Sequence, residues 1–525
     1  MTSRIARHID GRLETCPTVE TPPTVETSQS RCRLGVARCD ITPPVGIYHR
    51  MWGAATHDRA AGIHRPLTAD AIIFQSLEQP ASTKAISPSN SSRTPAESGV
   101  AGDAEQILIA VDHCLLWNRE MQALLDAVSQ QAQVPREKLL VVFSHTHSAG
   151  LMDFDRRHLP GGELIGPYLD TLAQKLAATV CAARASLQPA AIVYGQGRCA
   201  LAGNRDFRDA DSGAYVCGYN PEGFADDTVV VARATDDAGG ILATFVNFAC
   251  HPTTLAWENQ LISPDFPGAM RELVEQATNA PCIFLQGASG DLGPREGFSG
   301  DPALADRNGR QLGYAALSAM EALPPAGTRF EYAGPVVSGA TLGVWKHSLL
   351  PAEQAAAKFR WRLARWTVNL PYRPELPTNE SLRAARALFE AAQKKAEQTN
   401  DPALSRDAHA MIERMDRQLT RLAALPTGPD IPLPVWLWEI GDALWVAVEA
   451  EHYQYLQRTL RERFPGFPIV VMTLANGSRP SYLPTAEVYD TGVYPETIAV
   501  LARGSLERLI EAISERIAAW RPAAC

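Results

Sequence analysis

The sequence contains no long apolar run. No window approaches the ~18 uninterrupted apolar residues of a membrane-spanning helix, so we expect no transmembrane segment. The first residues also lack the apolar core that a secretory signal peptide requires. We therefore expect a cytoplasmic protein.

An excess of basic charge is absent as well. The chain has 49 Lys and Arg residues against 58 Asp and Glu, which gives a formal net charge of −9. Nucleic-acid-binding proteins carry a basic patch, and overall negative charge opposes adhesion to anionic membranes. We expect no nucleic-acid partner. The ten cysteines form no Cys-x-x-Cys pair, and in a chain of this length we expect buried, reduced thiols rather than a disulfide framework.

Strand-like and helix-like patterns alternate over much of the chain. Residues 1–31 are rich in Thr, Pro, Glu and Ser, which is typical of a disordered leader. Further along, continuous apolar runs are each followed by an amphipathic helical pattern; these runs are 107–116, 139–148, 241–252 and 282–291. Such units predict an α/β fold with a mixed, mostly parallel sheet covered by helices.

One segment departs from this alternation. Residues 346–431 are charged and amphipathic and show no strand signal, which predicts an α-helical insertion. The strand pattern then returns near Val435. We therefore expect one catalytic domain made of 32–345 and 432–525, interrupted by the helical insertion.

Polar side chains gather where the predicted strands end. These positions hold Asp112, His145 and His147, His251, and Asp291 in the loop QGASGD. In open α/β sheets the carboxyl ends of strands form the ligand crevice. The coincidence predicts one site assembled from distant segments.

The pair His145-Thr146-His147 suggests a metal. If the backbone stays extended, the period of two places both imidazoles on one face, and neutral imidazole suits zinc. An isolated His-x-His pair is nevertheless more often structural than metal-binding, and the same holds for a lone residue such as His251.

Two further segments carry possible ligands. Glu449 and Glu451 lie two residues apart on a strand that leads into a helix, and Tyr482 lies in a turn-rich loop. A carboxylate there could complete a zinc shell or act as a base, and a phenol can ligate a metal. Without other context, an exposed strand edge and a packing tyrosine are the more common explanations of these residues.

Taken in order, these segments resemble the neutral/alkaline non-lysosomal ceramidase family. Each motif alone is weak, but seven in the correct order are specific, and the match spans roughly 33–345 and 432–525. The matching motifs are GVARCDITPPVG, SHTHSAG, GNRDF, ACHPTT, FLQGASGDLGP, VEAEHY and ANGSRPSYLPT.

The resemblance implies a single Zn²⁺ held by His145, His251, Glu451 and Tyr482, with His147 beside it as a hydrogen-bond or proton-transfer group. Glu451 aligns with the glutamate of the family's Pro-Gly-Glu signature, although the two preceding residues here are Glu449 and Ala450. Two histidines and one carboxylate are also a ligand set that hydrolytic zinc sites use independently of this family.

The sequence departs from the family in two respects. The serine that the family's ceramidases use in catalysis is replaced by Gly293, and Ser289 lies four residues earlier. We also expect no carboxyl-terminal β-sandwich domain after the tyrosine loop. These differences argue against ceramide itself as the substrate.

The resulting hypothesis is attack by zinc-activated water on the amide bond of a small-molecule or lipid-like N-acyl substrate. The candidate catalytic residues are His147, Asp112, Arg205 of the GNRDF motif, and Ser289. Asp112 or Asp291 could orient a histidine through its second nitrogen. Two alternatives stay open: a zinc esterase or other acyl hydrolase acting on a non-sphingolipid substrate, and a catalytically inactive homologue that binds a ligand.

Overall fold

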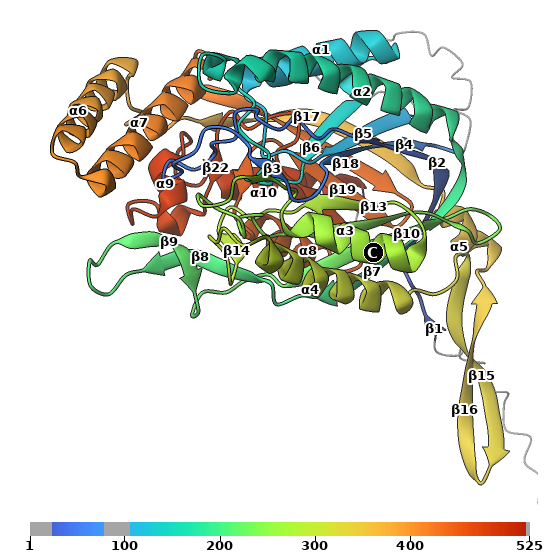
Figure 1. The fold of residues 1–525 in the computed structure, drawn as a ribbon. Coiled ribbons are helices and arrows are strands. Elements are labelled where there is room, and N and C mark those ends of the chain that lie inside the picture. Colours follow the sequence, from blue (N-terminus) through green and yellow to red (C-terminus); the bar gives the residue numbers. More distant parts are fainter. Residues whose placement is uncertain (1–23, 78–104, 521–525) are drawn as a thin grey trace, which may run out of the picture.

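The computed structural model describes residues 24–77 and 105–520 (Figure 1). Most of the predicted leader 1–31 lies outside the described residues. Its last part is not disordered, because Thr24–Val25 form strand β1 and the long strand β2 begins at Gln29. In the described part no helix is long and apolar enough to cross a membrane, and the eight cysteines found there are all free thiols.

The centre of the protein is an eight-stranded sheet with the order β13-β11-β10-β7-β2-β4-β5-β6. Its strands are β2 (Gln29–Asp40), β4 (Thr68–Gln75), β5 (Glu105–Val111), β6 (Leu139–Phe143), β7 (Gln188–Arg198), β10 (Thr228–Thr235), β11 (Ile241–Phe248) and β13 (Cys282–Gln286). Only the pairs β5–β6 and β11–β13 are parallel, whereas the other neighbours run antiparallel. The mixed α/β class is thus confirmed, but the mostly parallel sheet is not.

The two parallel pairs are the two places where a helix connects neighbouring strands. Helix α1 (Asn118–Ala132) joins β5 to β6, and α3 (Phe266–Thr278) joins β11 to β13. The sequence pattern identified these units, but it did not show that most other neighbours are linked without a helix. Continuous apolar strands indicate only that both faces of a sheet are buried.

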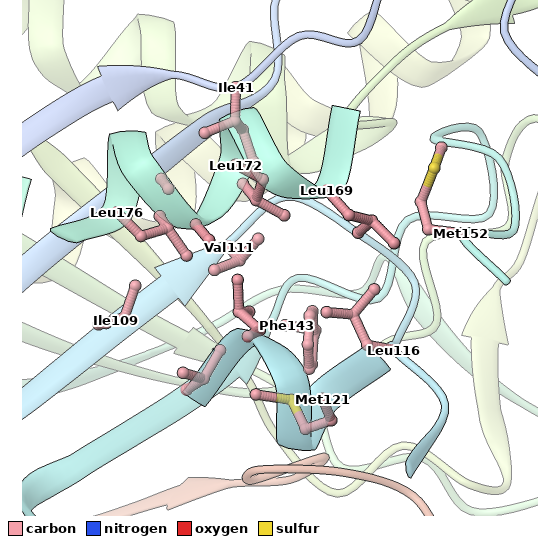
Figure 2. Close-up of a cluster of buried hydrophobic side chains, with 14 of the residues drawn as sticks. Ile41, Ile109, Val111, Leu116, Met121, Phe143, Met152, Leu169, Leu172 and Leu176 are labelled. Carbon is pink, nitrogen blue, oxygen red and sulfur yellow. The ribbon is translucent and has the colours of Figure 1, made fainter. Parts of the chain in front are cut away.

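Helices cover one face of the large sheet. They are α1, α2 (Ile165–Ala185), α3 and α4 (Pro302–Glu321). Figure 2 shows Leu169, Leu172 and Leu176 of α2 on one side of a cluster that also contains Met121 of α1 and Phe143 of β6. The predicted helices that follow the apolar strands are therefore present and pack as expected.

A second sheet covers the opposite face. It has the order β17-β18-β19-β21 and consists of β17 (Trp361–Pro371), β18 (Asp430–Ile440), β19 (Ala443–Val448) and β21 (Ile469–Met472). Trp436, Trp438 and Trp445 are buried against the large sheet. The other face packs on α8 (Tyr455–Arg463) and α10 (Ser505–Trp520). The fold therefore has four layers, in the order helix, sheet, sheet, helix.

The predicted insertion 346–431 is only partly helical. It contains the end of β16 (Ala340–Leu349), the short α5 (Ala352–Ala357), and the helices α6 (Asn379–Gln398) and α7 (Pro402–Ala423). Residues Trp361–Pro371 instead form strand β17, which pairs with β18 along its whole length. Because β17 is an edge strand, it carries the charged side chains that edges commonly have. These charges gave the segment a sequence pattern similar to that of an amphipathic helix.

Strand β15 (Thr328–Ser338) pairs with β16, and this hairpin projects away from the layers (Figure 1). The remaining strands form small sheets. β3 (Gly62–Ile63) pairs with β12 (Leu261–Ile262), β8 (Ala202–Arg208) lies between β14 (Leu292–Pro294) and β9 (Tyr215–Asn220), and β20 (Glu451–His452) pairs with β22 (Tyr482–Leu483).

The large sheet curls until its two edge strands, β6 and β13, touch each other. A twist of roughly 20–25° per strand pair adds up to about half a turn over the sheet. Strands β6 and β11 would run in opposite directions in a flat sheet, but this twist brings their carboxyl ends to the same place. His145 follows β6 and His251 follows β11, so the curl is what allows these residues to meet.

The interface between the two sheets gives a first testable prediction. Trp445→Ala should lower the free energy of unfolding by about 3–5 kcal/mol, because it leaves a cavity between the layers. The control Trp345→Ala changes a tryptophan of the projecting hairpin, which is 38% exposed, and should cost well under 2 kcal/mol. Denaturant titration measures both, and similar losses in the two variants would contradict the layered packing.

Candidate metal centre

Three buried side chains converge on one point. Nε2 of His145 lies 3.1 Å from Oε2 of Glu451, and Nε2 of His251 lies 3.0 Å from the same oxygen. The three ligand atoms lie within 4.8 Å of one another. The hydroxyl of Tyr482, also buried, is 3.3 Å from Nε2 of His251. The four residues that the resemblance assigns to the metal are thus brought together.

The local backbone places these side chains. Glu451 and Tyr482 are direct partners in the parallel pair β20–β22. His145 has φ +68°, and Ala450, immediately before Glu451, has φ +87°. Both values lie in the left-handed region that side chains rarely adopt, and such backbone strain is often found at functional sites.

The left-handed residues also explain which glutamate reaches the site. In an extended strand Glu449 and Glu451 would point to the same face, but Ala450 breaks the alternation. Glu449 instead binds Arg479, with 2.6 Å between its Oε2 and Nη2 of the arginine. Of these two glutamates, Glu451 alone faces the histidines. The structure thus places the glutamate that the resemblance favoured, whereas strand spacing alone did not distinguish the two.

The second nitrogen of each histidine is already engaged. Nδ1 of His145 donates to the carbonyl oxygen of Cys114 at 2.8 Å, and Nδ1 of His251 donates to that of Ser289 at 2.7 Å. A carbonyl can only accept, so in the neutral rings both Nε2 atoms are acceptors. They face a carboxylate, which is also an acceptor. A cation between these atoms resolves the conflict, so the residues fit a bound metal ion.

The electrostatics agree with a cation at this point. Burial opposes ionisation of Glu451, but His145 and His251 hold the pKa of its carboxyl well below the usual range. Burial, together with Arg205, lowers the pKa of His251 to about 3. Burial also opposes charge on His145, yet Cys114 and Glu451 raise its pKa well above the ordinary value. The carboxylate therefore attracts one positive charge into the cluster.

A second group of potential ligands is formed by Cys114, His145 and His147. Sγ of Cys114 lies 3.5 Å from Nδ1 of His145, and this nitrogen already donates to the Cys114 carbonyl. The group with Glu451 uses the free Nε2 instead, and it is the better metal site.

His147 lies beside the cluster. Its ring centroid is 4.9 Å from that of His145 and 5.9 Å from that of His251. Its Nε2 atom is buried and has no hydrogen-bond partner among the described residues, and the side chain lines a cavity. A nitrogen without a partner at such a position is available to a bound molecule.

Arg205 borders the same cavity and is buried. It donates to the Tyr482 hydroxyl at 3.0 Å and to the Gly290 carbonyl at 2.8 Å. These contacts fix the phenol next to His251. The structure thus brings Arg205 into the site, as the GNRDF motif suggested.

Two other predicted residues lie away from the cluster. Asp112 forms a two-point salt bridge with Arg271, with both contacts at 2.9 Å, and accepts from the Thr68 backbone. It does not orient a histidine, because Arg271 and Thr68 already occupy its carboxylate. Asp291 binds the backbone and side chain of Gln454 instead.

Ser289 lies on the far side of His251. Its hydroxyl accepts from Gln286 at 2.6 Å and lies 3.2 Å from Nδ1 of His251, the nitrogen that points away from Glu451. Gly293 is the position nearer the cavity, because a Cβ there would meet the cavity residues Thr253 and Arg205 at ordinary contact distance. Ser289 is therefore poorly placed to attack a substrate.

A cavity of about 410 Å³ adjoins the cluster. Sequence reasoning missed most of its walls. The missed residues include members of four separate regions: Met51 and Trp52; Thr253 and Trp257; Phe298; and Ala410, Glu413, Arg414, Arg417, Gln418 and Arg421 of α7. The one signal in the sequence was the amphipathic pattern of α7, but such a pattern does not show where a helix packs.

The α/β fold that holds this candidate centre is similar to that of solved structures. No protein-family model matches the sequence, and a search of curated proteins finds no match. The solved neutral ceramidase from Pseudomonas aeruginosa is similar, with a TM-score of 0.60 and 16% identity over 95% of this chain and 75% of that one. A ceramidase complexed with C2 gives 0.57 and 15%, covering 95% of this chain and 77% of that one. The chain has a divergent ceramidase-like fold.

The strain at Ala450 gives a prediction about stability. Ala450→Gly should stabilise the protein by about 0.5–1 kcal/mol, because a left-handed alanine costs about 1–2 kcal/mol and the added freedom of the unfolded glycine offsets part of this. Ala447→Gly, in the extended strand β19, is the matched control and should destabilise by at least about 0.5 kcal/mol. Thermal melting compares the two, and a loss of stability in both would contradict the strain.

Proposed function

We propose that this protein is a zinc-dependent hydrolase that cleaves the amide bond of an N-acyl substrate. The observation that carries the proposal is the convergence of His145, His251 and Glu451, whose free acceptor atoms face one another beside a cavity. The likeness of the fold to neutral ceramidases supports the same reaction class. The substrate is a small or lipid-like molecule.

Zinc is the proposed ion because of the donor set. Two imidazole nitrogens, a carboxylate and a phenol offer the nitrogen and oxygen ligands that hydrolytic zinc sites use. A zinc ion held by His145, His251, Glu451 and Tyr482 would supply Lewis acidity and lower the pKa of a water ligand toward ~7.

The chain's own residues have separate tasks in this mechanism. His147 accepts a proton at Nε2 and returns it to the leaving amine, since this atom has no hydrogen-bond partner among the described residues and the side chain lines the cavity. Arg205 holds the Tyr482 hydroxyl in place through its hydrogen bond. Water is the proposed nucleophile, because Ser289 lies behind His251 and Gly293 provides no hydroxyl. The α7 helix closes one side of the cavity against bulk water.

The same centre would also suit the hydrolysis of an ester. A homologue that only binds a ligand would have no need for the metal-binding residues. Comparing an N-acyl amide with the matching ester separates the first two, and loss of turnover with a chelator separates both from the third. The cytoplasmic location stays a prediction.

Metal content tests the proposal directly. The purified protein should hold one zinc ion per chain, and His251→Ala should abolish binding because it removes a ligand. His158→Ala, which changes an exposed histidine, is the control and should keep the metal. Elemental analysis of the wild type and the two variants measures the zinc content of each. Full zinc content in the His251 variant would refute the ligand assignment.

The roles of His147 and Ser289 are separable by paired variants. His147→Ala should retain zinc while kcat falls by the ~10²–10⁴-fold typical of a lost general acid–base. Ser289→Ala should keep kcat within about tenfold, an effect of roughly 1.4 kcal/mol on the barrier. Steady-state kinetics and metal analysis measure both. Loss of zinc in the first variant, or an acyl-enzyme trapped on Ser289, would overturn this division.

A further inference from the structure

One face of α7 forms a wall of the cavity. The residues concerned are Ala410, Glu413, Arg414, Arg417, Gln418 and Arg421, and their spacing of three and four places them on one side of a helix. Three of them are arginines. With Arg205 on another wall, four guanidinium groups border the cavity, which makes it strongly cationic.

The protein balances these positive charges only in part. Among the described residues, Glu413 is the one acidic side chain in the cavity wall. Its carboxylate lies 2.8 Å from Arg156, which is outside the wall, and 3.8 Å from Arg417. Arg205 donates to a carbonyl and a phenol, both neutral groups. Arg414 donates to the Thr497 hydroxyl, and Arg417 donates to the Met51 carbonyl. An excess of positive charge therefore remains around the space that a substrate would fill.

Among these arginines, Arg421 has the fewest interactions that could balance its charge. It is 9% exposed, and its guanidinium has no hydrogen-bond acceptor among the described residues; its one ring contact is with Trp117, at 6.0 Å. Burying a cation without a partner is costly. Burial lowers its pKa, against opposing contributions from Tyr494, Glu451 and Tyr482, so Arg421 lies within the electrostatic reach of the metal centre. A bound anion would supply the missing partner.

Another wall of the cavity is apolar and aromatic. The rings of Trp257 and Phe298 stack with centroids 6.4 Å apart, and Trp52 contacts Phe298 edge-on at 5.7 Å. Trp52 also contacts His147, with ring centroids 5.2 Å apart. A ligand matching the whole cavity has an apolar part for these rings and an anionic part for α7.

We propose that the substrate is an N-acyl amino acid whose free carboxylate binds Arg421, supported by Arg417 and Arg414, while its acyl group packs on Trp52, Trp257 and Phe298. The planar guanidinium matches a carboxylate in two-point contact. Hydrolysis breaks the C–N bond, the water oxygen joins the acyl carbon, and the nitrogen gains a proton. The products are a carboxylic acid and an amino acid. This inference rests on the proposed hydrolase function.

Paired substrates test the preference. For the zinc-loaded wild type, kcat/KM for an N-acyl amino acid should exceed that for its neutral carboxamide by about 10- to 100-fold, the effect expected of one charge-assisted contact. Arg421→Met should lower this ratio at least about tenfold. The control Arg406→Met removes an exposed arginine from the same helix and should keep the ratio. A wild-type ratio near one would overturn the proposal.

A binding measurement gives a second readout. Calorimetry with a non-hydrolysable analogue, in which a CH₂ group replaces the amide carbonyl, should show affinity reduced about 10- to 100-fold in Arg421→Met. Unchanged affinity would overturn the anion site. If no N-acyl compound is hydrolysed but binding still depends on Arg421, the hydrolase proposal fails and the anion site stands. Should Arg421→Met not fold, Arg417→Met must lower the same ratio; an unchanged ratio there would refute the proposal.

Discussion

The site depends on one buried carboxylate, that of Glu451, which faces the Nε2 atoms of two imidazoles. A cation bound between Glu451 and the Nε2 atoms of His145 and His251 would balance this buried negative charge. The carbonyls of Cys114 and Ser289 hold the rings in that orientation. Four distant chain segments must therefore meet at one point, and the curled sheet and the β20–β22 pair are the structural means by which they do.

The sequence predicted which residues form this cluster, but it did not predict how their side chains are oriented. Strand ends carrying His145 and His251 pointed to a shared crevice, and that inference held because the chain continues from buried strands into loops. Strand spacing alone could not separate Glu449 from Glu451, because that choice depends on the backbone of Ala450, and only the family resemblance favoured Glu451. A φ of +87° at one residue reverses the expected alternation, and propensity gives no sign of an alanine in that region.

The fold was predictable where the interactions are local. Helices α1 and α3 follow apolar strands and form two of the four strand–helix units that the pattern indicated, the two in which the strands pair in parallel. Strand pairing between segments far apart in the sequence gave no such signal, so the antiparallel centre of the sheet was missed. Strand β17 was misread for a related reason. It carries two arginines and two tryptophans close together at the sheet edge, and only the long pairing with β18 shows that the segment is extended.

The same difference applies to the site. The candidate metal ligands lie in motifs that can be read from the sequence, whereas the cavity wall depends on how distant segments pack. The ligands come from motifs that occur in order along the chain and resemble those of ceramidases, so they define which chemistry the site offers. The arginines of α7 lie outside those motifs, in a segment whose packing no local pattern fixes. Because α7 supplies side chains to the cavity but no metal ligand, changes along its inner face can alter which molecule is bound while the ligand set stays intact. In the proposed function, reaction type and substrate choice are thus assigned to different parts of this chain.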